Sequence, residues 1–535
     1  MNEQTRIHLT NLQNKLKEIS RYSHCARLMS FDRETIAPKD ALENENDTLD
    51  FLYAKIFEIK KTKEYEESIV YLHNHIDELE PLDQRLITLL YRNYEDNINV
   101  TPELDARRNT LFNKAYVDWL KAKNESNYSL FSSDLKDIIE ITKEFIDLRP
   151  AKKEIIYDNL IGEYEEGMTT EKLDKFFNSL KERIVPLLRK IQNSKTKIRT
   201  DFLTRPVSIE KQAKFSEYLL NVIGFDFNKG MLSKTEHPFT SDIGYNDVRV
   251  TTHYYENLFL SNVYSVIHEG GHAIFGQCET QDKYDHFIDQ SMTMAMHESV
   301  SRFYENRIGR SREFIHLIYP KFKELFIDEF SDVSEEELYN GVNVVEASLI
   351  RTEADELTYS LHIIVRYEME KALSEGRITV DEAPAMWNKL YEEYLGVKPN
   401  NDSEGILQDV HWASGFGYFP TYALGNAYNA MYILEMQKDF DVFKAVENGE
   451  MHKINAWMKE HVFKNASVLD PNDWIKSICG KELDPTPYLD YLEEKYSKKK
   501  KSDTEVIEFS KKESSEVDNL NRHIRIDSNS IERKT

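Results

Sequence analysis

The chain has 535 residues and carries 69 Lys and Arg against 94 Asp and Glu, which gives a formal net charge of −25. This charge repels phosphate backbones and anionic lipid, which argues against nucleic acid and membrane surfaces as partners. The sequence is 40% hydrophobic and has only 18 glycines, a balance typical of a globular, mostly α-helical protein. No apolar run approaches the roughly 20 residues needed to span a bilayer.

The N-terminus and the cysteines bear on the cellular compartment. The sequence does not open with a basic flank and an apolar segment, so nothing resembles a secretory signal and we expect a cytoplasmic protein. The three cysteines, Cys25, Cys278 and Cys479, form no C-x-x-C pair. We therefore expect reduced thiols rather than a disulfide frame or a thiolate metal site.

Apolar residues recur at three- and four-residue spacing through most of the chain, which predicts helices. The segment from Leu173 to Ile191 is an example. Helix starts are predicted at Thr101-Pro102 and at Thr169, where a capping residue precedes the apolar pattern. No fixed repeat period is visible, which excludes a solenoid.

One stretch, residues 247–255, has a different pattern. It alternates and is rich in β-branched and aromatic residues, with Gly244 and the segment His237-Pro238-Phe239 upstream. This pattern predicts a short strand or hairpin immediately before a long helix.

Histidines crowd into the same region. Of the 16 histidines in the chain, seven lie between residues 237 and 316. Two of them belong to the segment His268-Glu269-Gly270-Gly271-His272, an H-E-x-x-H pattern. On a helix the two imidazoles share one face and can bind one ion at about 2.0–2.1 Å, while Glu269 beside them can hold an attacking water.

The two glycines of this pattern and its third ligand need separate explanations. Each glycine costs a helix roughly 1 kcal/mol relative to Ala, so we expect a substrate or the neighbouring strand to approach closely there.

A catalytic zinc uses three protein ligands and an open fourth position. Glu298, which follows His272 by 26 residues, would complete a His, His, Glu site. The alternative is a solvated helix residue at this position.

These motifs resemble the carboxypeptidase Taq family of metallocarboxypeptidases, and the resemblance runs from about residue 20 to about residue 496. The matching blocks, in chain order, are His237-Pro238-Phe239, Asp247-x-Arg249-x-Thr251, the H-E-x-x-H segment, His297-Glu298-Ser299-x-Ser301-Arg302, Ile350-Arg351-x-x-Ala354-Asp355, and Gly405-x-x-Gln408-Asp409-x-His411-Trp412.

The resemblance implies a large helical metallopeptidase fold with a deep central groove, a small β-sheet or hairpin beside the zinc helix, and a homodimer. It also implies one divalent ion per chain, with zinc as the first choice and cobalt as the alternative. We expect residues 1–200 to form one groove wall and residues 201–496 to form the catalytic region. Residues 497–535 are polar and Lys-rich, which predicts a disordered tail, or else a basic patch for a partner.

The activity implied by the resemblance is hydrolysis of the C-terminal peptide bond by a metal-activated water, with Glu269 as general base. Tyr422 and His411 are candidates to stabilise the oxyanion of the tetrahedral intermediate. The alternative for Tyr422 is a core aromatic residue with a satisfied hydroxyl.

Two arginines are candidates for substrate binding. Arg351 can bind the terminal carboxylate through two parallel hydrogen bonds, or it can form a weak surface ion pair with Asp355 one turn later. Arg249 can align the peptide along an edge strand, or Asp247 and Arg249 can only stabilise the sheet.

Three functions therefore compete. The first is a metallocarboxypeptidase acting on peptides with a free C-terminus. The second is a related helical HExxH oligopeptidase that cuts internally or releases dipeptides. The third is a catalytically silent peptide-binding scaffold, against which the intact Glu269 argues, because a pure binding protein needs no general base.

Overall fold

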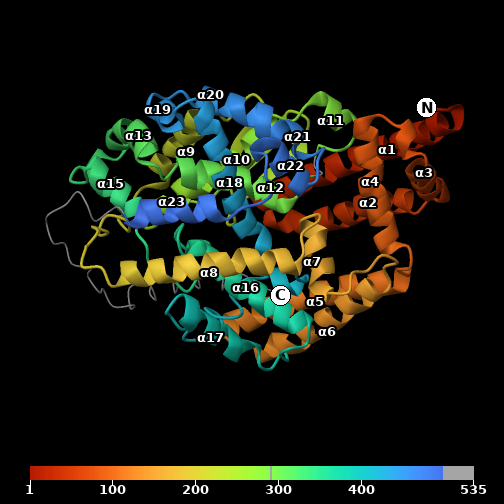
Figure 1. Cartoon of the computed structure of the whole chain (residues 1–535), viewed down its shortest axis with the longest axis horizontal. Helices are drawn as coiled ribbons and strands as arrows, with labels where there is room; N and C mark the ends of the chain where they lie inside the picture. The colour runs from red at the N-terminus through yellow and green to blue at the C-terminus, as the bar shows by residue number, and fades with distance from the viewer. Residues whose placement is uncertain (290–291, 498–535) are drawn as a thin grey trace.

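The computed structural model describes residues 1–289 and 292–497 (Figure 1). The fold is mostly α-helical with one small sheet, as predicted. The first four long helices are α1 (Glu3–Thr35), α2 (Leu42–Lys60), α3 (Lys63–Asn74) and α4 (Pro81–Asn97), with the short turns η1 (Lys39–Ala41) and η2 (Ile76–Glu78) between them. Apolar residues of α1, α3 and α4 form a small core of their own.

The next four helices are α5 (Pro102–Glu125), α6 (Ser129–Asp147), α7 (Ile156–Tyr164) and α8 (Thr170–Gln192). The side chain of Thr101 caps α5 and that of Thr169 caps α8, which confirms both predicted helix starts. In the view of Figure 1, α5, α6 and α8 lie in the lower half of the molecule together with α16 (Tyr359–Ser374) and α17 (Ala383–Tyr394).

The sheet comprises β1 (Gly230–Lys234), β2 (Thr240–Gly244) and β3 (Asp247–Thr252), which follow α9 (Ile209–Ile223). β2 and β3 form the predicted hairpin, and β1 pairs with the other side of β3 in a parallel direction that the sequence pattern did not predict. The long helix α10 (Phe259–Gln277) then packs against β2 and β3. The sheet therefore lies beside the helix that carries the H-E-x-x-H segment.

The upper half of Figure 1 contains α9, α10 and most of the remaining helices. The segment after α10 consists of α11 (Gln281–Asp285), α12 (Met294–Arg302), the π-helical turn η3 (Phe303–Ile308), α13 (Arg312–Leu325), α14 (Ile327–Phe330), α15 (Glu335–Val342) and η4 (Arg351–Glu353). After α17 come η5 (His411–Ala413), α18 (Pro420–Asp439), α19 (Val442–Glu447), α20 (Met451–Trp457), η6 (Met458–Phe463), α21 (Lys464–Ala466), α22 (Pro471–Cys479) and α23 (Thr486–Ser497).

Helix α18 lies at the centre of the main core and supports α12. Most of its residues up to Met436 are buried, as expected of a helix surrounded by others, and its exposed polar residues lie in the last turn. A side chain at Gly425 would lie 3.0 Å from the backbone of Glu298 and Ser299. The contact between the two helices therefore requires a glycine, and it fixes the position of the helix that carries Glu298.

The main core draws residues from Ala115 to Tyr496, so it includes both sides of position 200. The division into residues 1–200 and 201–496 stays a prediction. The expected tail lies outside the described residues except for Ser497, which is the last residue of α23.

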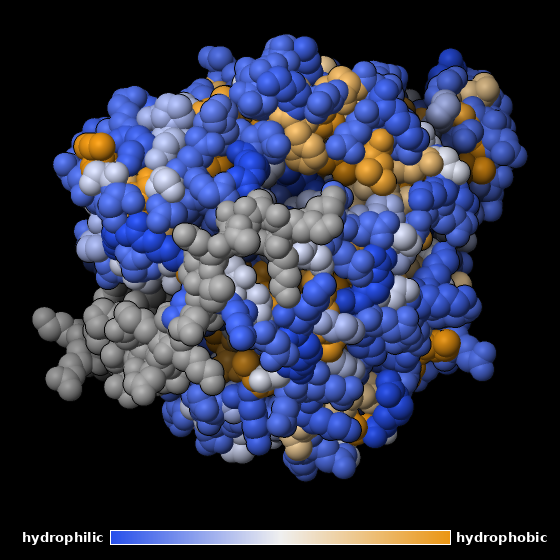
Figure 2. Space-filling view, turned by 60° about the vertical axis from the view of Figure 1, so that its left-hand side comes forward, coloured by the Kyte–Doolittle hydropathy of each residue, from blue (hydrophilic) through white to orange (hydrophobic). Residues whose placement is uncertain are grey.

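The surface agrees with the charged composition. The face in Figure 2 is mostly hydrophilic, with apolar side chains gathered in small patches. Within residues 1–289 and 292–497, no helix is both long and apolar enough to cross a membrane. All three cysteines are free, as predicted.

Candidate metal centre and active site

Helix α10 packs closely between α9 and α12 at its two adjacent glycines. A side chain at Gly270 would lie 2.6 Å from Ile223 of α9, and one at Gly271 would lie 2.9 Å from Ser301 of α12. The expectation that a substrate or the neighbouring strand approaches these glycines is therefore wrong. Gly271 lets α10 pack closely against α12, the helix of the third candidate ligand, and Gly270 lets it pack against α9.

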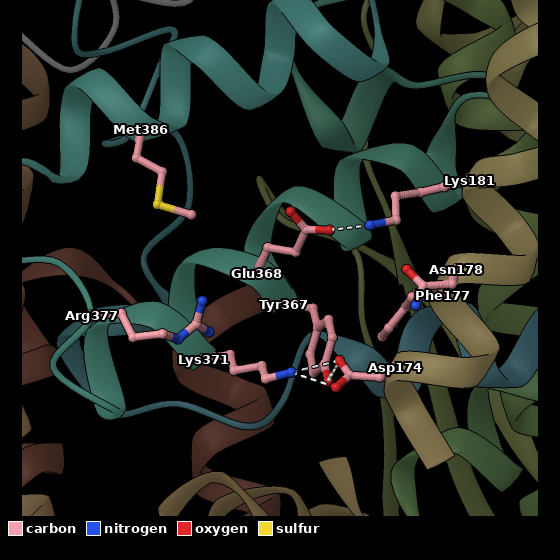
Figure 3. Close-up of a pocket in the computed structure, with 9 residues that line it drawn as sticks. All are labelled: Asp174, Phe177, Asn178, Lys181, Tyr367, Glu368, Lys371, Arg377 and Met386. Carbon is pink, nitrogen blue, oxygen red and sulfur yellow. Dashed lines mark hydrogen bonds and ion pairs between the residues drawn. The ribbon is translucent and has the colours of Figure 1, made fainter. Parts of the chain in front are cut away.

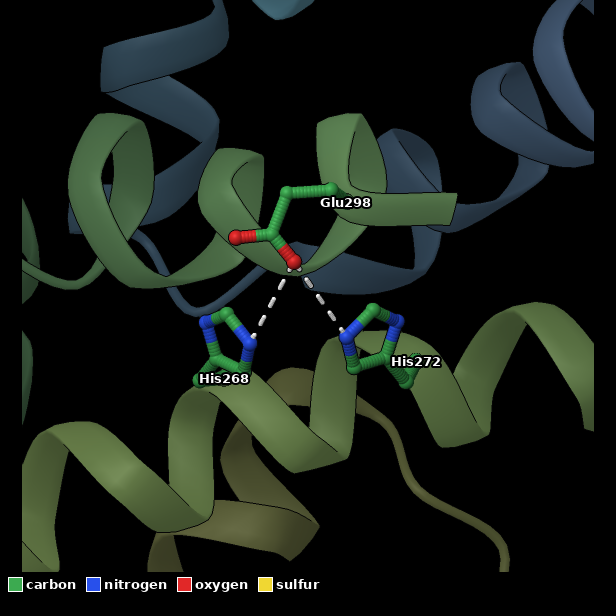
Figure 4. Close-up of side chains that lie close together, drawn as sticks. All are labelled: His268, His272 and Glu298. Atoms are coloured by element: carbon green, nitrogen blue, oxygen red, sulfur yellow. Dashed lines mark ion pairs between the residues drawn. The ribbon is translucent and has the colours of Figure 1, made fainter. Parts of the chain in front are cut away.

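This packing brings the three candidate ligands together (Figure 4). Oε2 of Glu298 lies 3.6 Å from Nε2 of His268 and 3.6 Å from Nε2 of His272. One ligand atom from each of the three side chains lies within 4.8 Å of the others. Two ligands of a tetrahedral ion, each at about 2.1 Å, lie about 3.4 Å apart. The spacing of the three side chains thus fits one such ion.

The remaining polar atoms of the two imidazoles have partners that orient the rings. Nδ1 of His268 lies 2.8 Å from the carboxylate of Glu305, and Nδ1 of His272 lies 2.6 Å from Nδ1 of His297. A proton on Nδ1 of His268, donated to Glu305, leaves the lone pair of Nε2 available to a metal. Burial, followed by the effect of His297, holds the pKa of His272 well below its ordinary value. This favours the neutral ring that metal binding needs.

The carboxylate of Glu298 is also fixed. Its Oε1 accepts a hydrogen bond of 2.7 Å from Nε of Arg302, and its Oε2 accepts one of 3.1 Å from the hydroxyl of Ser301. Because Arg302 occupies Oε1, only Oε2 faces the imidazoles. Burial opposes ionisation of Glu305, but Arg302 and His268 hold its pKa below the ordinary range. Glu305 is therefore a carboxylate.

Glu269 lies on α10, between the two candidate histidine ligands, and is 9% exposed. The hydroxyl of Thr240, on β2, lies 2.7 Å from its Oε2 and 2.9 Å from its backbone carbonyl oxygen. Burial raises the pKa of Glu269, which brings it closer to neutrality, as suits a group that must accept and return a proton.

Arg351 lies in a buried ion-pair network rather than at the surface. Its Nη2 donates to Asp409 at 2.7 Å and its Nη1 donates to the hydroxyl of Tyr359 at 3.1 Å. Arg366, which is fully buried, pairs with the other oxygen of Asp409 at 2.5 Å. The alternative surface pair of Arg351 with Asp355 is wrong, since Asp355 accepts backbone hydrogen bonds from residues 346, 357 and 358.

His411 and Tyr422 lie against each other beside this network. The hydroxyl of Tyr422 is 3.5 Å from Nε2 of His411, at the outer limit of a hydrogen bond. Burial lowers the pKa of His411 to about 4 and raises that of Tyr422 well above its ordinary value. Both side chains are therefore neutral at pH 7.

Tyr359 joins this group to the metal centre. The guanidinium carbon of Arg302 lies 4.0 Å from the centroid of its ring, and its hydroxyl accepts from Arg351. The ring also packs edge-on against Tyr422, with centroids 6.2 Å apart. The structure thus brings Arg351, His411 and Tyr422 together beside the candidate ligands.

Arg249 lies elsewhere, on β3. It forms two hydrogen bonds of 2.8 Å with the carboxylate of Asp247, and its guanidinium carbon lies 5.2 Å from the ring of Phe31. Of the two roles left open for Arg249, this ion pair supports stabilisation of the sheet.

Known proteins resemble this chain over nearly its full length. The family model of Carboxypeptidase Taq (M32) metallopeptidase matches residues 11–496. The chain belongs to this family. Carboxypeptidase 1 of Bacillus subtilis (strain 168) is 40% identical over 485 residues, which cover 90% of this chain and 96% of that protein. Thermostable carboxypeptidase 1 of Pyrococcus furiosus is 31% identical over 486 residues, 90% of this chain and 97% of that protein.

Solved structures agree with the family assignment. The crystal structure of the M32 carboxypeptidase from Deinococcus radiodurans R1 has a TM-score of 0.88 at 28% identity, and the match covers 92% of this chain and 99% of that one. This chain is therefore a metal-dependent carboxypeptidase, a hydrolase that acts on peptide bonds. Neither the oligopeptidase nor the silent scaffold receives support from these similarities.

Three residues that position side chains of this carboxypeptidase's candidate site were given no role from the sequence. Arg302 and Glu305 follow Glu298 by four and seven residues, so helical spacing alone could have placed them on its face. Glu370 gave no such signal. It is buried on α16 and accepts hydrogen bonds from Tyr157, from the Trp412 indole and from the backbone of residue 417. It thereby holds the loop that carries His411.

A pocket away from these residues lies between α8, α16 and α17 (Figure 3). Its carboxylates are already paired, Asp174 with Lys371 at 2.5 Å and Glu368 with Lys181 at 2.6 Å. Its lining contains no histidine or cysteine. It therefore offers neither a metal site nor a base for hydrolysis.

Proposed function

We propose that His268, His272 and Glu298 bind the divalent ion of this carboxypeptidase, with zinc as the first choice and cobalt as the alternative. The observation that carries the proposal is the equal distance of 3.6 Å from Oε2 of Glu298 to both Nε2 atoms. Two imidazoles and one carboxylate form a donor set that suits a catalytic zinc and leaves one coordination position open.

Glu269 acts as the general base in this proposal. When bound, the ion would supply a Lewis acid that polarises the scissile carbonyl and lowers the pKa of water towards about 7. Glu269 accepts the proton of the attacking water and later returns it to the leaving amine. The contact with Thr240 restricts the carboxylate to one orientation, which reduces the reorganisation needed in the transition state.

Arg351 binds the terminal carboxylate of the peptide. Asp409 occupies the edge of the guanidinium formed by Nε and Nη2, so one N–H on each of Nη1 and Nη2 remains to be donated. Arg351 and Arg366 share a single carboxylate, Asp409, which leaves one positive charge for an incoming anion. A bidentate contact of this kind contributes about 1.5–3 kcal/mol.

Tyr422 and His411 assist at the scissile bond. Because Tyr422 keeps its proton, its hydroxyl can donate a hydrogen bond to an oxyanion. Neutral His411 can accept or donate one. Arg249 remains a weaker candidate for alignment of the peptide, since Asp247 already occupies it.

The assembly and compartment complete the proposal. We place the enzyme in the cytoplasm, where its three free cysteines would stay reduced, and we propose a homodimer on the basis of the family resemblance. Residues 1–200 would form one wall of the groove that holds the peptide, and residues 201–496 would form the catalytic region.

The experiment compares one peptide with a free C-terminus against the same peptide amidated, with products followed by mass spectrometry. The free acid should be trimmed stepwise and the amide cut at least about 10-fold more slowly, because the amide cannot make the charge-assisted contact. Equal rates, or internal fragments as first products, would instead support the oligopeptidase.

Variants of Arg351 identify the group that recognises the carboxylate. Arg351→Ala should lose most of the preference for the acid, and Arg351→Lys should recover only part of it, because an ammonium lacks the planar fork. Arg377→Ala is the control, since Arg377 lies in the pocket of Figure 3, away from these contacts. An unchanged preference in Arg351→Ala would assign the contact to another residue.

A further inference from the structure

Arg307, on η3, is a buried arginine without an ion-pair partner in the described part of the chain. It is 4% exposed, and its guanidinium carbon lies 3.5 Å from the centroid of the Tyr491 ring. Its Nε donates to Oδ1 of Asn429 at 2.9 Å. A buried charge normally has a partner of opposite sign, because its desolvation is otherwise uncompensated.

Glu356, an acidic group on which the charge of Arg307 acts, already has a partner. Its Oε2 pairs with Lys495 at 2.6 Å, and the two side chains are 3% and 7% exposed. The same oxygen accepts a hydrogen bond of 3.0 Å from Tyr496. Lys495 and Arg307 thus share one carboxylate, and this part of the core keeps one uncompensated positive charge.

The neighbouring charges on the same helical segment do not remove the excess. Arg302 pairs with Glu298 at 2.7 Å and with Glu305 at 3.2 Å, and Arg310 lies 3.6 Å from Glu305. Two cations there face two carboxylates. The excess charge therefore belongs to Arg307.

Arg307 and the asparagine that accepts from it, Asn429, each have a buried hydrogen-bond donor without an acceptor in the described part of the chain. Nη2 of Arg307 and Nδ2 of Asn429 are both buried and have no acceptor among residues 1–289 and 292–497. The orientation of the Asn429 amide is fixed, because its Oδ1 accepts from Nε of Arg307. Nη2 is bonded to the same carbon as the donor Nε, and Nδ2 is bonded to the same carbon as the acceptor Oδ1. Buried donors are nearly always satisfied, so a group that accepts from both is expected here.

We propose that Arg307 and Asn429 bind a small monovalent anion, of the size and charge of chloride, between η3, α18 and α23. An anion accepts both hydrogen bonds and also balances the charge, whereas a water molecule would satisfy only the first requirement. The ring of Tyr491 covers one face of the Arg307 guanidinium, so the anion would bind in the plane of the guanidinium, where Nη2 has an N–H that no described residue accepts.

The anion would stabilise the part of the core that supports the candidate metal centre. Arg307 follows Glu305 by two residues, and Asn429 follows Gly425, which contacts Glu298, by one turn of α18. A ligand that binds only the folded state raises stability in proportion to the logarithm of its concentration once that concentration exceeds the dissociation constant.

The first test measures the thermal midpoint of the metal-loaded full chain in a potassium chloride series, with potassium gluconate keeping the ionic strength constant. The midpoint should rise by equal steps for each tenfold increase in chloride, and bromide should act alike. A midpoint independent of chloride would overturn the proposal and leave a water molecule at the site.

A variant that carries its own negative charge sharpens the test. Asn429→Asp places a carboxylate opposite Nε and Nη2 of Arg307, so its midpoint should no longer respond to chloride. Asn448→Asp is the matched control at an exposed position, and it should keep the wild-type response. A chloride response that persists unchanged in Asn429→Asp would show that chloride binds elsewhere.

The second test does not depend on a variant that folds. Wild-type crystals grown in bromide should show an anomalous peak between Nη2 of Arg307 and Nδ2 of Asn429. Absence of a peak at this position at saturating bromide would overturn the proposal.

Discussion

The candidate metal centre and the cationic group around Arg351 lie side by side, but they are built differently. The metal centre takes its ligands and its base from two helices, α10 and α12, and each side chain is oriented by a neighbour on α12, on the turn η3 that follows it, or on the adjacent strand β2. The group around Arg351 takes its members from η4, α16, η5 and α18, and the buried carboxylate of Asp409 holds its two arginines together.

The metal centre is therefore a local arrangement, built on a few neighbouring elements, whereas the group around Arg351 is a distributed arrangement, built from segments far apart in the sequence. A four-residue spacing on a helix places two side chains on one face whatever the rest of the fold does. The group around Arg351 exists only when several distant segments meet and every buried charge finds its partner. The first arrangement should therefore resist single changes outside its ligands, whereas the second should be sensitive to one carboxylate.

Removal of the metal should have the largest effect, because it acts on the centre of the local arrangement. A chelator should abolish peptidase activity, and zinc or cobalt should restore it, since about one ion is expected for three protein ligands. Metal content and turnover are measured on the same sample. Full activity in rigorously metal-free protein would contradict the proposed centre.

Loss of the shared carboxylate should have the next largest effect. Asp409→Asn leaves Arg351 and Arg366 buried without a full counter-charge, which should lower the free energy of unfolding by about 3–5 kcal/mol. Asp247→Asn is the matched control, because the ion pair of Asp247 with Arg249 is partly exposed, with side chains 36% and 22% accessible, and should cost less than about 1 kcal/mol. Urea unfolding measures both values, and equal losses would contradict the distinction.

Glu269→Gln tests the base without disturbing the packing. The substitution keeps the shape and the contact with Thr240 but removes the proton acceptor, so turnover should fall at least about 100-fold, equivalent to about 2.7 kcal/mol. Metal content should stay at the wild-type level and serves as the control. A variant with normal metal content and near wild-type turnover would rule out Glu269 as the base.

The same contrast explains how much the sequence could predict. Helical periodicity predicted the helix of His268, alternation of β-branched and aromatic residues predicted the strand or hairpin before it, and the family resemblance predicted the fold class. The helices that pack against Gly270 and Gly271 could not be predicted, because a glycine in a helix indicates that another segment approaches closely but not which segment it is. Asp409 was visible as part of a motif, yet its pairing with Arg366 depends on tertiary structure alone.

Protonation of His411 should have a smaller effect on stability. Burial lowers its pKa in the folded state to about 4, so between pH 6.5 and 4 the unfolded chain binds more protons and stability falls as the pH falls. At pH 5 this histidine should cost about 2 kcal/mol relative to pH 7. His411→Gln should therefore show a shallower loss of unfolding free energy between pH 7 and pH 5.

A second histidine provides the control for this measurement. His316→Gln changes a side chain that is 56% exposed, so its loss of stability between pH 7 and pH 5 should match that of the wild type. If His411→Gln also matches the wild type, the buried environment of His411 does not control the acid sensitivity.

Deletion of residues 498–535 should have the smallest effect, because the structured core ends with α23. Tyr496, the last buried residue, and Lys495 both contact Glu356, and these contacts remain when the chain stops at Ser497. The thermal midpoint and turnover of the shortened chain should stay close to wild type. A chain that ends before Thr486 is the contrast, since it also removes the buried Tyr488, Leu489 and Leu492 and uncovers Arg307, and it should lose the cooperative transition. A large fall in the thermal midpoint of the 1–497 chain would show that residues 498–535 pack against the rest of the protein and contribute to its stability.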